Sequence, residues 1–114
     1  MSGYNVKNVA VTAGYITPEA RKEFYKYMDA ANVDLKGFTE EFYHKLCNGH
    51  LSDVLETLSY LKNETDVWLE ITNLIIPGQN DQENDIDSMT KWINTKLGSN
   101  VALFFYLINT FFLY

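Results

Sequence analysis

The sequence is poor in the features that would assign it to a secreted, membrane or nucleic-acid-binding class. Its only cysteine, Cys47, excludes an internal disulfide and weakly favours a reducing compartment. No run of Lys or Arg offsets the net charge of −6, which argues against nucleic acid and anionic lipid as partners. No stretch reaches the roughly 18 apolar residues of a membrane span, and the start MSGYNVKNV lacks the apolar region of a signal peptide. We therefore expect a cytoplasmic protein.

Apolar segments of two kinds alternate along the 114 residues. Runs rich in β-branched residues, typical of buried strands, alternate with segments of helical periodicity, which favours a βα order and a mostly parallel sheet in one α/β domain over residues 1–114. The expected strands are VKNVAVTAG (6–14), ANVDLKG (31–37), VWLEITNLII (67–76) and a last one beginning near Val101. The expected helices are ITPEARKEFYKYMDAA (16–31), FTEEFYHKLCNG (38–49), HLSDVLETLSYLKNE (50–64) and DQENDIDSMTKWINTKLG (81–98).

Helix ends and helix faces support this order. Thr17 and Thr39 stand at N-cap positions, and Pro18 suits a first helical turn. Two segments space apolar residues at three and four positions, which predicts helices that bury one face. The two apolar faces are Leu51, Val54, Leu55, Leu58 and Leu61 in one helix, and Ile86, Met89, Trp92, Ile93 and Leu97 in the other.

Polar residues inside or at the end of apolar strands are the candidate site. In parallel α/β proteins functional residues gather where the strands end, because the loops leaving those ends frame the binding crevice. Thr12 ends the first strand, Asp34 and Lys36 end the second, and Glu70 and Thr72 share a face of the third. Two interpretations remain open at this point. Asp34 and Lys36 form either an exposed ion pair of little energetic consequence or part of a site, and Glu70 lies either at a solvated edge or towards a polar site.

Three segments together resemble one enzyme family. TAGY (12–15), VDLKG (33–37) and VWLEITNLIIPGQND (67–81), in this order and at these separations, resemble the radical S-adenosylmethionine activating enzymes. The similarity is closest to relatives of pyruvate formate-lyase activating enzyme, in particular the AmmeMemoRadiSam-system branch, and covers about residues 9–98. It implies part of a TIM-like (β/α) barrel that holds S-adenosylmethionine above a [4Fe-4S] cluster. Reductive cleavage would give methionine and a 5'-deoxyadenosyl radical, which takes hydrogen from a protein or other substrate.

The resemblance also implies roles for the candidate residues. Asp34 and Lys36 match positions near the methionyl carboxylate, where a lysine suits a carboxylate and an aspartate can take the amino group or a cation. Thr12 matches a position lining the same site. Glu70 is implied to hydrogen-bond the ribose, and Thr72 completes the expected cofactor-binding set.

The sequence also departs from the family. The CxxxCxxC motif that would hold the cluster is absent, and Cys47 alone cannot replace it. The apolar end, residues 99–114, reads VALFFYLINTFFLY from Val101, where the family has a strand leading to a histidine. We therefore expect the carboxyl-side part of a radical S-adenosylmethionine core, inactive alone, whose ending reflects a reading-frame change or an early stop. The alternative is a small non-catalytic α/β binding or interaction module.

Two further expectations concern metals and self-association. His44, Cys47 and His50 are three apart, but Gly49 interrupts the helix and no fourth ligand is near, so surface or capping roles are favoured over zinc. A partial barrel leaves strand edges exposed, and the apolar end needs burial, so we expect a homo-oligomer.

Overall fold

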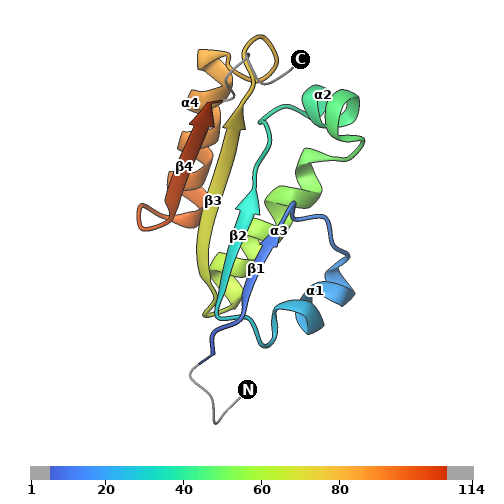
Figure 1. Cartoon of the computed structure of the whole chain (residues 1–114), viewed down its shortest axis with the longest axis vertical. Coiled ribbons are helices and arrows are strands. Elements are labelled where there is room, and N and C mark those ends of the chain that lie inside the picture. Colours follow the sequence, from blue (N-terminus) through green and yellow to red (C-terminus); the bar gives the residue numbers. More distant parts are fainter. Residues whose placement is uncertain (1–5, 108–114) are drawn as a thin grey trace.

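The computed structural model describes residues 6–107 and shows one parallel sheet flanked by helices. The strands lie side by side in chain order, and every neighbouring pair is parallel (Figure 1). The prediction of an α/β fold with a parallel sheet is confirmed. The strands are β1 (Val9–Thr12), β2 (Ala30–Asp34), β3 (Trp68–Ile75) and β4 (Ala102–Leu107).

The helices begin where the sequence places them. The Thr17 side chain accepts a hydrogen bond from the N–H of Ala20 (3.3 Å), and the Thr39 side chain accepts one from Phe42 (3.0 Å), so both predicted N-caps are confirmed. Two helices end in π-helical turns, a feature that the apolar periodicity did not predict. The helical elements are α1 (Pro18–Tyr25), α2 (Glu40–Phe42) with η1 (Tyr43–Cys47), α3 (Leu51–Glu64), and α4 (Glu83–Trp92) with η2 (Ile93–Leu97).

One face of the sheet carries the hydrophobic core. When consecutive parallel strands are neighbours, right-handed crossovers place all the connecting helices on the same side. The odd-numbered residues of β2 and β3 face these helices and are buried, except for the half-buried Ile75, as the alternation on a strand predicts. Both apolar helix faces point into this core, although Leu55, Ile86 and Trp92 are only half-buried. The core residues of the strands and helices include Ala31, Val33, Leu35, Leu69, Ile71, Val54, Leu58, Leu61, Met89, Ile93 and Leu97.

Within residues 6–107 no element covers the opposite face of the sheet (Figure 1). This face carries the even-numbered residues of β2 and β3, the exposed valines of β1, and the residues of β4 in register with them. We call it the open face. The same part of the chain contains no helix long and apolar enough to cross a membrane. The last seven residues of the apolar end lie outside the described residues, whereas the strand expected near Val101 is confirmed as β4.

Two asparagines join the ends of β2 and β3. The buried Asn73 side chain donates from Nδ2 to the carbonyl of Leu35 (2.7 Å). Asn80, in the turn after β3, donates from Nδ2 to the carbonyls of Lys36 (2.8 Å) and Leu74 (2.8 Å). Its Oδ1 accepts from the N–H of Ile76 (2.7 Å). These bonds replace the strand ladder beyond the last paired residue of β2.

We expect Asn80→Asp to lower the free energy of unfolding by about 2–4 kcal/mol, because three hydrogen bonds depend on the amide and a carboxylate oxygen would face two carbonyl oxygens. Urea unfolding followed by circular dichroism measures the change. The control is Gln79→Glu, which makes the same amide-to-carboxylate change on an adjacent exposed side chain. Equal stability of the two variants would contradict a locking role for Asn80.

Candidate functional site

Asp34 and Lys36 lie on the open face where β2 ends. Their neighbours Val33 and Leu35 are fully buried against the helices, so alternation directs the two charged side chains to the other side. The Lys36 Nζ is 2.9 Å from Asp34 Oδ2, and the two side chains remain 39% and 43% exposed. Each charge therefore has a partner while staying in contact with solvent. Such a pair adds only about 0–1 kcal/mol to stability.

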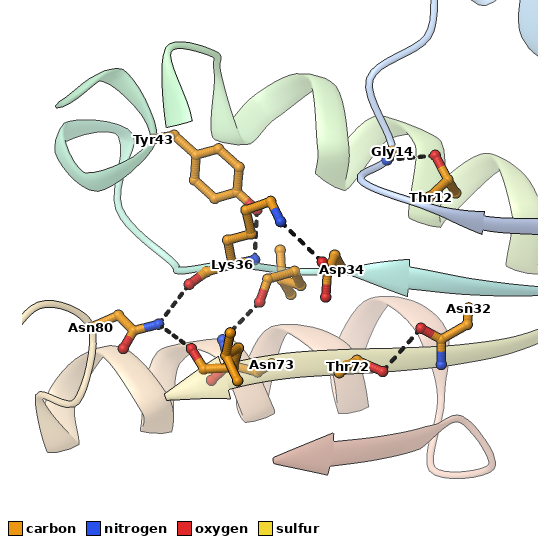
Figure 2. A network of polar contacts seen from close by, with 11 residues as sticks. Thr12, Gly14, Asn32, Asp34, Lys36, Tyr43, Thr72, Asn73 and Asn80 are labelled. Atoms are coloured by element: carbon orange, nitrogen blue, oxygen red, sulfur yellow. Dashed lines mark hydrogen bonds and ion pairs between the residues drawn. The ribbon is translucent and has the colours of Figure 1, made fainter. Parts of the chain in front are cut away.

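The backbone of Lys36 is held on both sides (Figure 2). Its N–H donates to the hydroxyl oxygen of Tyr43 (2.8 Å), and its carbonyl accepts from Asn80. Tyr43 is fully buried, and burial raises the pKa of its hydroxyl, so this group stays neutral. The position of the lysine side chain thus depends on two buried side chains from later segments.

A pocket of about 320 Å³ lies beside the ion pair. Its walls come from the segment after β1, from α2 and η1, and from the end of β3, so it lies at the carboxyl ends of the strands. The walls are mostly apolar, and the charges of the pair are its strongest polar features. The lining residues are Tyr15, Asp34, Lys36, Phe42, Leu46, Cys47, Leu74 and Ile76.

Thr72 and Glu70 lie on the open face away from the pocket, and we call the row that they form with Asn32, Asp34 and Lys36 the polar strip. Thr72 is in register with Asp34, and its hydroxyl donates to Asn32 Oδ1 (3.0 Å). Glu70 lies two residues nearer the amino end of β3, where its carboxylate accepts from the indole N–H of Trp68 (3.3 Å). The structure thus brings four of the candidate residues onto one face, but only Asp34 and Lys36 line the pocket.

The fifth candidate, Thr12, lies elsewhere. It is in register with Val33, so its side chain points towards the helices and not to the open face. Its hydroxyl oxygen accepts from the N–H of Gly14 (3.1 Å) and shapes the turn that leaves β1 (Figure 2). The structure does not bring Thr12 together with Asp34 and Lys36. The Thr12 side chain lies on the face of the sheet that the helices cover, whereas the other two lie on the open face. Tyr15 reaches the pocket from this segment instead.

Sequence reasoning missed the residues that support the site. The sequence pattern predicts Tyr43 only as part of a helix and Asn80 only as part of a turn. A carboxamide at Asn73, in the most apolar strand, was the one available signal, because a buried amide needs partners. The Asn73 Nδ2 donates a hydrogen bond to the carbonyl of Leu35, whereas the buried Asn73 Oδ1 has no hydrogen-bond partner among the described residues.

Cys47 lines the pocket without forming a metal site. Within the described part of the chain, no three His, Cys, Asp or Glu side chains are placed to hold a metal ion. His50 instead approaches Glu40, at 3.6 Å from Nδ1 to Oε2. Burial raises the pKa of the Cys47 thiol, and the nearby positive charge of Lys36 lowers it in part.

We expect Lys36→Ala to slow the reaction of Cys47 with a disulfide reagent several-fold at pH 8, because losing the cation raises the thiol pKa further and leaves less thiolate. The rate is followed from the released thiol chromophore between pH 7 and 9.5. Lys62→Ala removes an exposed lysine outside the pocket and should leave the rate unchanged. An unchanged or faster rate in Lys36→Ala would show that Lys36 does not act on this thiol.

The sequence is similar to the uncharacterized protein MJ0808 of Methanocaldococcus jannaschii. The two are 39% identical over 98 residues, which are 86% of this chain and 28% of the relative. The chain therefore spans less than a third of the length of the curated relative it matches. No protein-family model matches the sequence.

Proposed function

We propose that this chain is part of a radical S-adenosylmethionine barrel and that its pocket receives the methionyl end of S-adenosylmethionine. The observation that carries the proposal is the position of the Asp34–Lys36 pair. It lies on the open face, at the carboxyl ends of parallel strands and at the edge of a pocket large enough for part of a small ligand. The resemblance over VDLKG implies the same two residues.

The pocket has groups that match an amino acid with an apolar chain. The Lys36 ammonium would bind the α-carboxylate, and Asp34 would bind the α-amino group or a cation beside it. The apolar walls made by Phe42, Leu46 and Leu74 suit the methylene and methyl groups near the sulfur. Glu70 and Thr72 lie farther along the open face, where the ribose would extend. Thr12 is left out of the binding set, because it faces the helices.

The [4Fe-4S] cluster does not fit this chain. Three thiolates are needed to hold it, and the sequence has one cysteine. When bound, the cluster supplies the electron that cleaves S-adenosylmethionine, so we derive no reaction step for this chain alone. The proposal is that it binds the cofactor, while radical formation and hydrogen abstraction from a protein or other substrate belong to a protein with further segments. The length of the relative, of which the match covers 28%, supports a larger parent.

A second candidate function is a non-catalytic interaction module. The observation that favours it is the open face, which carries large exposed apolar side chains next to the polar strip. In that case the Asp34–Lys36 pair is a structural surface pair.

We expect isothermal titration calorimetry to show saturable binding of S-adenosylmethionine and S-adenosylhomocysteine, weakened about 10- to 100-fold in Lys36→Ala through loss of a charged hydrogen bond. Calorimetry is preferable to tryptophan fluorescence, because Trp68 lies at the amino end of β3 and does not line the pocket.

Lys62→Ala, on an exposed helix position, is the matched control and should bind as the unmodified chain does. No heat of binding at millimolar ligand, in a chain whose circular dichroism shows it folded, would sink the cofactor proposal and leave the interaction module. If Lys36→Ala binds S-adenosylmethionine with the same affinity as the unmodified chain, the binding site lies away from the Asp34–Lys36 pair.

A further inference from the structure

We propose that the open face is the contact surface for a second copy of this chain, and that two copies close into one eight-stranded barrel. This goes beyond the cofactor proposal: it concerns the chain by itself, without the further segments of a larger protein, and does not depend on whether the pocket binds S-adenosylmethionine. It depends on three observations: the apolar content of the face, the pairing of its polar groups, and the direction of its two edge strands.

The first observation is that large apolar side chains lie exposed on β1, β3 and β4 of the open face, on both sides of its polar residues. Parallel sheets are normally covered on both faces, whereas here Val11 is 82% and Trp68 is 61% exposed. The strand registers place these side chains on one surface, together with Val9, Leu74, Phe104 and Tyr106. Four strands about 4.8 Å apart and about 20 Å long give a face of about 400 Å² in projection. Exposed apolar side chains that share one face and surround polar residues are typical of an interaction site.

The second observation is that most polar side chains of this face have a partner within it. The Thr72 hydroxyl is bonded to Asn32, and the Glu70 carboxylate accepts from Trp68. Lys36 and Asp34 neutralise each other, so the ionised side chains of the open face sum to about −1 while the chain carries −6. Most of the negative charge therefore lies off this face. Covering it with an identical face therefore brings little repulsion, and the Glu70 carboxylate, which has one donor within the face, is the group that would lose water.

The third observation is that, within residues 6–107, β1 and β4 are both free edges of the sheet and run in the same direction. Rotation by 180° about an axis parallel to the strands leaves the strand direction unchanged. It therefore brings β4 of each copy beside β1 of the other as parallel neighbours, and the two junctions are identical. The result has eight parallel strands inside and all the helices outside, which is the number that closes a (β/α) barrel.

These observations favour a second copy over an unrelated partner. A closed barrel has no free strand edge. Only a partner sheet with a similar number of strands, running in the same direction, can pair with β1 and β4 at once. Both Asp34–Lys36 pockets would lie at the same end of the barrel, because both sets of strands point the same way. The polar strip would then face the barrel interior.

The test is sedimentation velocity from about 2 to about 200 µM, with mass read from the profile. We expect a species of twice the 13.2 kDa chain mass. Val11→Glu places a carboxylate on β1, where β1 meets β4 of the other copy, and should raise the dissociation constant at least 100-fold. Val11 is so exposed that the variant should keep its fold, which circular dichroism checks. Tyr27→Glu makes an equally severe change at an exposed position after α1, away from the open face, and should not alter the mass.

Hydrogen exchange at the two ends of the same concentration range distinguishes barrel closure from other modes of association. Closure predicts that amides of β1 and β4 become protected as the concentration rises, while those of α3 stay unchanged. A single 13.2 kDa species at the highest concentration overturns the proposal. So does a series of species larger than the dimer, or a dimer without protection in β1 and β4.

Discussion

The site depends on how the chain is held after β2 ends. Pairing with β3 continues only as far as a hydrogen bond from the N–H of Leu35 to the carbonyl of Thr72 (2.9 Å). Beyond it, the amide of Asn73 binds the carbonyl of Leu35, and the Lys36 peptide is held between Tyr43 and Asn80. These three side chains hold Leu35 and Lys36 as a continuation of β2, beyond the last residue of β2 that is paired with β3. As a result Lys36 keeps the strand alternation and points to the open face.

The loop that follows Lys36 is closely packed against α2. Gly37, directly after Lys36, is buried, and a Cβ added there would lie 2.5 Å from the Phe42 ring. Phe42 in turn lines the pocket. A side chain at position 37 would have to displace this ring, so the turn, the helix start at Thr39 and the pocket wall are coupled through one contact. The glycine is required here by space and not by its backbone angle.

Strand alternation is the part of the fold that the sequence predicts best, because a period of two needs no tertiary information. It correctly separates Val33 and Leu35 from Asp34 and Lys36, and it places Glu70 with Thr72. It does not decide the face of Thr12, which the sequence places only at the end of a strand and the resemblance places in the site. The register of Thr12 with Val33 decides its face, and a register between two strands is tertiary information. The sequence does not predict the role of Asn80 for the same reason, because its three hydrogen-bond partners belong to the ends of two different strands.

Glu70 is the residue at which the two proposals constrain each other. In the open sheet its carboxylate is half-exposed and accepts one hydrogen bond, from Trp68, so water satisfies its remaining lone pairs. If a second copy covers the face, that water must be replaced, because a buried carboxylate with one donor costs several kcal/mol. A polar ligand lying along the strip from Lys36 supplies donors at this place, as ribose hydroxyls would. A covered face and an occupied pocket therefore favour each other, and a carboxylate in the most apolar strand is easier to explain when both are present.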